Sequence, residues 1–287
     1  MLRFLRSALH MLFLVVTVIP WSLATVLLAP WVSKRRLYDF CVIWLGMATA
    51  SARVLLGIRA RVQGLQNLPD DSQTPVVLLC KHQSAWETFF LPTVSPRPLA
   101  YVFKRELTRV PFFGWALARL DMVHIDRGRP TEAFSRVVAQ GRRLLGQGVW
   151  VAMFPEGTRV PRGQQGKYRS GGARLAVECG ALVVPVAVTS ARCWPPRAFV
   201  KSPGVIDVSF GPPIDSQGRK ADELMRQVQE WIEAEMRRLD APAYGSAGAI
   251  GNAAENTAEN TAENTAENAT ENTAENATEN TAEARKA

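Results

Sequence analysis

The feature that most constrains this chain is an uncharged apolar stretch of 22 residues near its N-terminus, from Met11 to Val32. As a helix, this stretch is long enough to cross the hydrocarbon core of a bilayer, which is roughly 30 Å thick. A second apolar stretch runs from about Phe40 to Ile58 and is interrupted by Arg53. We therefore expect residues 1–58 to form a membrane-associated helical segment.

Basic residues flank both stretches, at Arg3, Arg6, Lys34, Arg35, Arg36, Arg59 and Arg61. Two full crossings would place the middle cluster outside, against the tendency of Lys and Arg to stay on the cytosolic side. A hairpin embedded from the cytosolic face keeps all of them on one side, and Pro20 and Pro30 would help it to bend. We favour this hairpin over a true span, with an active domain that faces the cytosol at the inner (cytoplasmic) membrane. A cleaved signal peptide is a further alternative, but no convincing cleavage site precedes Lys34.

The charge of the chain is unevenly distributed. The formal net charge is +8, from 34 bases and 26 acids, yet residues 252–287 contain eight Glu and only two bases. The other 32 bases and 18 acids give residues 1–251 a charge of +14, which suits an anionic lipid or a phosphorylated substrate. Nucleic acid is not expected, because no zinc-finger, RNP or basic-zipper pattern is present. The four cysteines lack metal-ligand spacing, so we expect reduced thiols and no metal site.

The middle of the chain alternates short β-branched runs with longer amphipathic ones, which is typical of an α/β domain. The predicted strands are Ile58–Val62, Pro75–Cys80, Leu99–Phe103, Met122–Ile125, Val149–Phe154, Leu182–Val188 and Val205–Phe210. The predicted helices are Ser84–Phe90, Phe112–Arg119, Thr131–Gly146, Gly172–Glu178 and Arg219–Leu239. We therefore predict a mixed sheet flanked by helices over residues 59–243.

After about Tyr244 the composition changes to Ala, Glu, Asn and Thr in a period close to four. On a helix the Glu residues would form a stripe, but no apolar face exists to be buried. Residues 244–287 are therefore predicted to be a low-complexity disordered tail. A dispensable repeat expansion explains this tail better than a binding module.

A polar cluster, residues 81–88, directly follows the apolar run PVVLLC. Proteins of the α/β class commonly place reactive groups at the end of a buried strand. Ser84 and Glu87 have the spacing of a capping box, which accounts for both without catalysis but leaves His82 unexplained. If a loop precedes the helix, Glu87 can reach His82 and hold the imidazole in one tautomer, leaving its other nitrogen as a base.

A second polar cluster, residues 154–159, follows the apolar run VWVAM. Gly157 allows a tight turn, and Arg159 offers a planar donor fork that suits phosphate. Acyl transfer from a thioester to an alcohol would need such a base, and Arg159 would suit an acceptor that carries a phosphate. The oxyanion that forms in such a reaction needs donors, and backbone amides near Ser84 or Gly157 are the candidates.

These clusters resemble the glycerolipid acyltransferase family, and in particular its 1-acyl-sn-glycerol-3-phosphate acyltransferases, which share four sequence blocks in a fixed order. His82 and Glu87 match the first block, His-x4-Asp, with Glu in place of the usual Asp. The second block, an apolar strand that ends in an Asp-Arg pair, resembles Met122–Arg127. The third block, Phe-Pro-Glu-Gly-Thr-Arg, is unaltered at 154–159, and the fourth resembles Val183–Val186.

The resemblance implies transfer of an acyl chain from acyl-CoA or acyl carrier protein to the sn-2 hydroxyl of lysophosphatidic acid, giving phosphatidic acid. It implies no cofactor beyond this co-substrate, a catalytic base in His82, and an orienting carboxylate in Glu87. The phosphate of the acceptor is expected at Lys104, Arg127, Glu156, Gly157, Thr158 and Arg159. Further candidates for phosphate contacts are Arg105, Lys167 and Arg169.

Three alternatives are open at this point. A relative that acts on another lysolipid, such as a lyso-ornithine lipid or a lysophospholipid, would have the same His-Glu pair and a different pocket. A serine hydrolase would need a Gly-x-Ser-x-Gly elbow, and the sequence has none. A non-catalytic membrane scaffold would tolerate His82→Ala without loss of acyl transfer.

Overall fold

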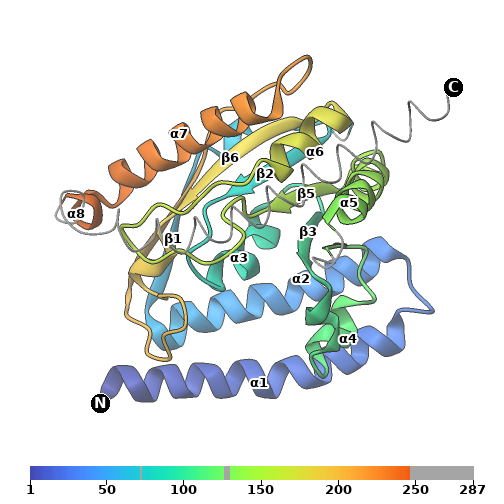
Figure 1. Ribbon diagram of the computed structural model, residues 1–287. Helices are drawn as coiled ribbons and strands as arrows, with labels where there is room; N and C mark the ends of the chain where they lie inside the picture. The colour runs from blue at the N-terminus through green and yellow to red at the C-terminus, as the bar shows by residue number, and fades with distance from the viewer. Residues whose placement is uncertain (72, 126–129, 246–287) are drawn as a thin grey trace, which may run out of the picture. The chain divides into compact units, whose positions relative to one another are not determined.

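The computed structural model describes residues 1–71, 73–125 and 130–245, and Figure 1 shows how their helices and strands are arranged. The chain divides into two units, Met1–Ala243 and Tyr244–Ala287. The repeat sequence of the second unit lies outside the described residues, so the disorder of this tail stays a prediction. The following description concerns the first unit.

A seven-stranded mixed sheet forms the centre of the first unit. Its strands, in spatial order, are β1 (Ile58–Gln63), β7 (Gly204–Phe210), β6 (Leu182–Val188), β2 (Val76–Cys80), β5 (Trp150–Met153), β3 (Leu99–Lys104) and β4 (Val123–Ile125). Neighbouring strands are parallel except β6 and β7, which are antiparallel. All seven predicted strands are present within one residue of their predicted ends, and the predicted mixed α/β fold is confirmed.

Helices cover both faces of this sheet, which explains why its central strands are apolar throughout. All five residues of β2, VVLLC, are buried, and a strand that is covered on both sides reads as a continuous apolar run. In Figure 1, α2 and α3 lie on one face and α5, α6 and α7 lie on the other. The bounds of the helices in the sheet domain are α3 (Trp86–Val94), α4 (Phe113–Leu117), α5 (Pro130–Leu145), α6 (Gly171–Cys179) and α7 (Ala221–Leu239), and α8 (Ala241–Tyr244) ends the described helices.

The N-terminal segment is a pair of antiparallel helices that pack beneath the sheet domain. Its elements are α1 (Leu2–Leu28), α2 (Lys34–Ser51) and a π-helical turn η1 (Ala52–Leu56). Trp21 of α1 donates its indole N–H to the carbonyl of Phe40 at 3.0 Å. The indole of Trp44 donates to Oγ1 of Thr17 at 3.1 Å. These contacts pair a later residue of one helix with an earlier residue of the other, as an antiparallel pair requires.

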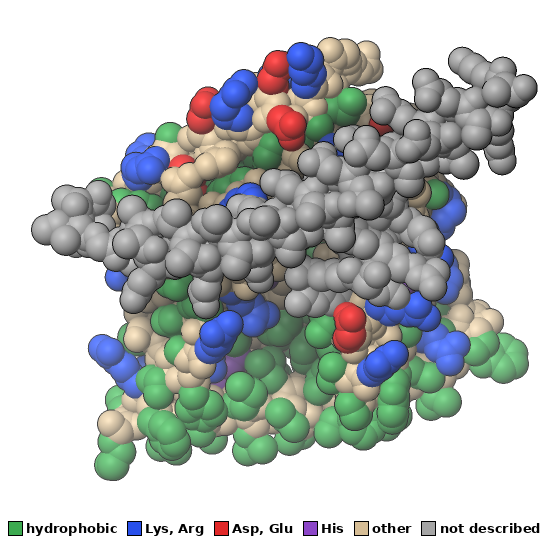
Figure 2. Space-filling view, viewed as in Figure 1, with side chains coloured by type: hydrophobic (Ala, Val, Ile, Leu, Met, Phe, Trp, Pro, Cys, Tyr) green, Lys and Arg blue, Asp and Glu red, His purple; other side chains and the backbone are tan. Residues whose placement is uncertain are grey.

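Helix α1 turns its polar side chains toward the protein and its large apolar side chains outward. Ser7, His10, Ser22 and Thr25 are buried. The exposed apolar side chains are Leu2, Phe4, Leu5, Leu9, Leu12, Val15, Val16, Leu23 and Leu27. Figure 2 shows apolar side chains gathered along this edge of the molecule, with Lys and Arg side chains beside them. A soluble surface rarely exposes so large an apolar patch, so this face marks a membrane or partner contact.

The hairpin also has the dimensions that a bilayer requires. By length and composition, α1 and the segment Lys34–Leu56 are each able to cross a membrane. Much of α2 is covered by α1 and the sheet domain, whereas α1 has a long open face (Figure 1). The open apolar face therefore belongs mainly to α1.

Candidate active site

The two polar clusters of the sequence meet at one edge of the sheet. Strands β2 and β5 are parallel neighbours, with Leu79 opposite Met153, so the residues that follow them leave the sheet side by side. The ring of His82 stacks on the ring of Phe154, with centroids 3.9 Å apart. The backbone N–H of Val160 donates to the carbonyl of His82 at 2.8 Å. Two segments far apart in sequence thus form one site.

His82 and Glu87 form the contact that the sequence predicted. Nδ1 of His82 lies 2.9 Å from Oε1 of Glu87. The carboxylate is fully buried, whereas 14% of the imidazole side chain is exposed. With Nδ1 occupied, Nε2 is the ring nitrogen left to face a substrate, and no other hydrogen bond of this ring occurs within the described residues. This is the arrangement of an oriented base.

Oε1 of Glu87 also holds the loop that carries His82. It accepts hydrogen bonds from the backbone N–H groups of Gln83 at 2.7 Å and of Ser84 at 2.6 Å. Because both backbone groups can only donate, Oε1 is an acceptor, and the third contact assigns the hydrogen to Nδ1 of His82. Oγ of Ser84 accepts from the N–H of Trp86 at 3.1 Å, so the predicted cap is present in a modified form.

Helix α3 begins at Trp86, two residues later than predicted. The delay has a physical cause, because the N–H groups of residues 82–84 donate to carboxylates and Ser84 caps the first turn from outside the helix. A single oxygen of Glu87 reaches the imidazole and the loop together. The loop-then-helix geometry is therefore built by the side chain that orients the imidazole.

A buried charged cluster lies behind His82. Nζ of Lys81 contacts Oε1 of Glu156 at 2.6 Å and Oε1 of Glu233 at 2.7 Å. The hydroxyl of Tyr168 donates to the same oxygen of Glu233 at 2.8 Å. The second oxygen of Glu156 accepts the backbone N–H of His82 at 2.8 Å. Burial raises the pKa of Glu156, while the nearby Lys81 ammonium opposes that rise.

Of the residues predicted to bind phosphate, some are exposed at the surface and one, Glu156, is buried. Gly157, Thr158 and Arg159 are exposed in the turn after β5, and Gly157 adopts the left-handed conformation with φ 67° that the turn needs. Arg159 forms no ion pair with any described acid. Glu156, by contrast, is buried with both oxygens bonded to Lys81 and His82. The side chain of Lys104 and the whole of Arg127 lie outside the described part of the chain.

The further candidates are all at the surface. Arg105, Lys167 and Arg169 are exposed. The N–H of Arg169 donates to the carbonyl of Pro155 at 2.9 Å, which joins the loop before α6 to the turn after β5. The backbone amides considered for an oxyanion are already engaged, since Ser84 donates to Glu87 and Gly157 donates to the carbonyl of Phe154. Within residues 1–71, 73–125 and 130–245, no group of three or more His, Cys, Asp or Glu is placed to hold a metal ion.

Comparison with known proteins decides the family. The sequence model of the family described as Acyltransferase matches residues 59–189. A protein of Pseudomonas aeruginosa named 1-acyl-sn-glycerol-3-phosphate acyltransferase is 41% identical over 239 residues, which cover 82% of this chain and 91% of the relative. The chain belongs to the acyltransferase family. A plant relative from Limnanthes douglasii with the same name is 26% identical, and the match covers 79% of each chain.

A solved structure supports the fold of this acyltransferase. It is the crystal structure of the 1-acyl-sn-glycerophosphate (LPA) acyltransferase PlsC from Thermotoga maritima, with a TM-score of 0.68 and 20% sequence identity. The match covers 83% of this chain and 97% of that chain. The shared architecture therefore includes much more than the residues of the family match.

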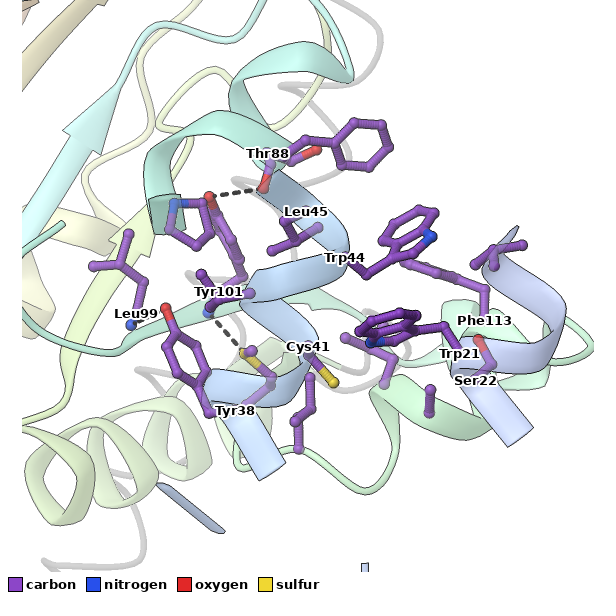
Figure 3. Close-up of a pocket in the computed structure, with 18 residues that line it drawn as sticks. Trp21, Ser22, Tyr38, Cys41, Trp44, Leu45, Thr88, Leu99, Tyr101 and Phe113 are labelled. Carbon is purple, nitrogen blue, oxygen red and sulfur yellow. Dashed lines mark hydrogen bonds between the residues drawn. The ribbon is translucent and has the colours of Figure 1, made fainter. Parts of the chain in front are cut away.

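An apolar cavity of the acyltransferase is lined by residues of both the N-terminal hairpin and the sheet domain. Figure 3 shows its lining, which comes from α1, α2, α3, β3 and α4 and includes Trp21, Trp44, Leu45, Tyr101 and Phe113. Thr88, the residue after Glu87, also lines the cavity. The Tyr101 and Phe154 rings stack with centroids 5.9 Å apart, and Phe154 in turn stacks on His82. A row of rings thus leads from the His82 imidazole to Tyr101, which lines the cavity.

Sequence reasoning missed the residues of the buried cluster. Lys81 stood next to His82 in a polar run, which gave no sign that it is fully buried. Its partner Glu233 lies on α7, outside residues 59–189, in a helix rich in exposed charges. The one signal was the place of Glu233 on the buried face of an amphipathic helix, beside Ile232 and one turn before Met236. A buried acid at such a place requires a cation, but the sequence does not say which one.

Proposed function

We propose that this acyltransferase transfers a fatty acyl group from a thioester donor, acyl-CoA or acyl carrier protein, to the sn-2 hydroxyl of 1-acyl-sn-glycerol-3-phosphate. The product is phosphatidic acid. The single observation that carries this proposal is the 2.9 Å contact between Nδ1 of His82 and Glu87, which leaves Nε2 available as a base. The names of the relatives support the choice of acceptor.

In the proposed reaction, Nε2 of His82 takes the proton of the acceptor hydroxyl as its oxygen attacks the thioester carbonyl. The imidazolium formed is stabilised by the buried carboxylate of Glu87. The tetrahedral intermediate then expels the thiolate, which takes the proton back from Nε2 and leaves as a thiol. An oxygen ester forms and a thioester breaks, with no covalent enzyme intermediate. Such a base contributes about 10²–10⁴-fold to the rate.

The acceptor phosphate is proposed to bind at the turn after β5. Arg159 is exposed there, and the next residue, Val160, is bonded to the backbone of His82, so the turn and the base are held together. A guanidinium donates two parallel hydrogen bonds to phosphate oxygens. Gly157 and Thr158 belong to the same turn, and Lys104 and Arg127 are kept as candidates on the sequence alone.

Glu156, which the resemblance implied as a contact of the acceptor phosphate, does not suit that role. Both of its oxygens are bonded inside the protein, and a carboxylate would repel the substrate anion. We assign it instead to the positioning of His82, because it accepts the backbone N–H of that residue.

The apolar cavity is proposed to hold an acyl chain of the substrate. Its lining is almost entirely apolar or aromatic and includes Thr88, the residue after the orienting carboxylate. A chain placed there would bring its carbonyl end to the edge of the sheet at which His82 lies. The exposed apolar face of α1 is proposed to lie in the cytosolic leaflet of the inner membrane, where such lipids are present.

The proposal is tested by assaying the purified protein in detergent micelles against a panel of lysolipids and both donor types. Lysophosphatidic acid is expected to be the preferred acceptor. Equal or better turnover of an acceptor without a terminal phosphate, such as a lyso-ornithine lipid, would contradict the proposed acceptor while leaving the chemistry in place.

Arg159→Gln is expected to raise KM for lysophosphatidic acid about 10- to 100-fold, because it removes a charge-assisted bidentate contact. Activity toward acceptors without a phosphate should change much less. Arg226→Gln, at an exposed position of α7, is the matched control. An unchanged KM in the Arg159 variant would remove this residue from the phosphate site.

A further inference from the structure

A hollow lined by three arginines lies at the end of the hairpin away from its turn. Its volume is about 550 Å³, and it is walled by the start of β7 as well as by the arginines. Arg6 comes from α1, Arg53 from η1 and Arg59 from β1, so three separate elements each bring one cation to the same place. The sequence had placed Arg6 and Arg59 in different basic clusters, 53 residues apart.

The charges of this hollow are not balanced by the described part of the protein. None of the three arginines forms an ion pair with a described acid. Nε of Arg6 donates to the carbonyl of Leu55 at 2.6 Å, which fixes this guanidinium against η1. Arg61, two residues along the same strand, is paired with the buried carboxylate of Asp207. The fold therefore supplies an acid to one arginine of β1 and leaves the neighbouring cluster to attract an external anion.

A second hollow shares two of these arginines and has a different character. It has a volume of about 380 Å³, and Arg53 and Arg59 are the only charged side chains that line it. Its other lining residues are small or apolar: Gly46, Thr49, Ala50, Ile58, Ala60, Trp86 and Phe90. Arg53 and Arg59 thus stand between a cationic hollow and a groove along α2. A molecule with an anionic head and a hydrocarbon chain has the same distribution of polarity.

The three arginines lie next to the exposed apolar face of the hairpin. Val54, beside Arg53, is 74% exposed, and Phe4 of α1 is 58% exposed. Strands β7 and β6 separate β1 from β2, so at about 4.8 Å between strands Arg59 lies on the order of 14 Å from the strand that leads to His82. The arginines are therefore next to the proposed bilayer contact and apart from Arg159.

We propose that Arg6, Arg53 and Arg59 bind the phosphate of an anionic glycerophospholipid of the bilayer, with one acyl chain in the groove along α2. Guanidinium groups suit the two free oxygens of a phosphodiester, and three of them can share one headgroup. Such a bound lipid would fix the open end of the hairpin at the level of the headgroups. The inference uses the membrane contact of α1 and does not depend on the chemistry of His82.

The test is native mass spectrometry of the purified full chain in neutral detergent, which removes the general attraction of a charged membrane surface. The protein is titrated with phosphatidylglycerol, with phosphatidylcholine and with inorganic phosphate. Retention of one phosphatidylglycerol, in preference to phosphatidylcholine and without competition from inorganic phosphate, is expected. Displacement of the lipid by inorganic phosphate would show a site for the free ion and would overturn the lipid assignment.

Variants locate the site. R53Q/R59Q is expected to weaken phosphatidylglycerol binding by roughly 25-fold, at roughly fivefold for each arginine, and R53K/R59K is expected to lose less because it keeps the charge. The control K220Q/R226Q removes two exposed cations, one directly before α7 and one on it, and should bind like the wild type. Equal loss in the control, or full binding by R53Q/R59Q, would overturn the proposal. So would loss of binding in R159Q alone, which would place the lipid at the catalytic site. If R53Q/R59Q does not fold, R59Q alone should show the fivefold effect.

Discussion

At the edge of the sheet where His82 lies, Oε1 of Glu87 accepts hydrogen bonds from Nδ1 of His82 and from the backbone N–H groups of Gln83 and Ser84. The bonds that hold the loop and the bond that orients the imidazole therefore end on the same oxygen atom. From the sequence these roles were competing explanations, because spacing alone does not show whether a cap also reaches an imidazole. The structure makes them compatible, since the loop brings His82 to the oxygen that holds the loop.

The two roles separate in Glu87→Gln. The amide keeps an acceptor oxygen for the loop but loses the charge that stabilises the imidazolium, so kcat should fall about 10²-fold or more. The melting temperature should change far less than the rate. Steady-state kinetics and thermal unfolding of the same preparation check this. A variant with near-normal kcat would show that Glu87 is only a cap.

At the scale of elements, helix α7 is tied to the catalytic loop through Lys81 and Glu156. Glu233 on α7 contacts Lys81 at 2.7 Å, and Lys81 contacts Glu156, which accepts the N–H of His82. A buried cation between two carboxylates stays in place only while each partner remains. We infer that Glu233 helps to position His82 through these contacts, although it lies outside the residues that the family model matches.

Glu233→Gln is accordingly expected to lower kcat about 10- to 100-fold, because the imidazole of His82 would shift. The KM for the acceptor should change little, because the turn after β5 that carries Arg159 stays exposed. Glu230→Gln, one turn earlier on the solvent side of α7, is the control and should behave like the wild type. In the background of His82→Ala, Glu233→Gln should cause no further loss. A further loss there would mean that Glu233 acts by another route.

Most helices and strands could be predicted from the sequence, but the contacts between side chains on different elements could not. The seven strands could be predicted because apolar runs such as VVLLC are bounded by polar turns. The start of α3 was placed too early because carboxylates from Glu87 and Glu156 hold the preceding backbone. The pairing of Lys81 with Glu233 joins residues whose contact depends on how α7 crosses the sheet. No local pattern contains that information.

At the scale of the whole molecule, helix α1 of the hairpin turns its polar side chains toward the protein and its apolar side chains outward. The sequence identified its apolar stretches, but it could not show that Ser7, His10, Ser22 and Thr25 of α1 face the protein. That assignment needs the position of the sheet domain. With the polar face covered, the leucines of α1 are left exposed on the opposite side.

Leu12→Lys together with Val16→Lys is expected to weaken membrane binding, because both side chains are exposed on the apolar face and a charge placed in hydrocarbon costs up to about 3 kcal/mol. Vesicle flotation of the full chain measures the effect. Glu230→Lys on α7 adds positive charge away from this face and should bind as well as the wild type. Undiminished flotation of the α1 double variant would show that this face does not enter the bilayer.

The central claim, that the imidazole of His82 is the base of acyl transfer, is tested most directly by the kcat of purified His82→Ala with acyl-CoA or acyl carrier protein donor and lysophosphatidic acid. The account predicts a fall of about 10²–10⁴-fold, with membrane binding and thermal unfolding close to those of the wild type. A folded, membrane-bound His82→Ala protein that transfers acyl groups at the wild-type rate would contradict it.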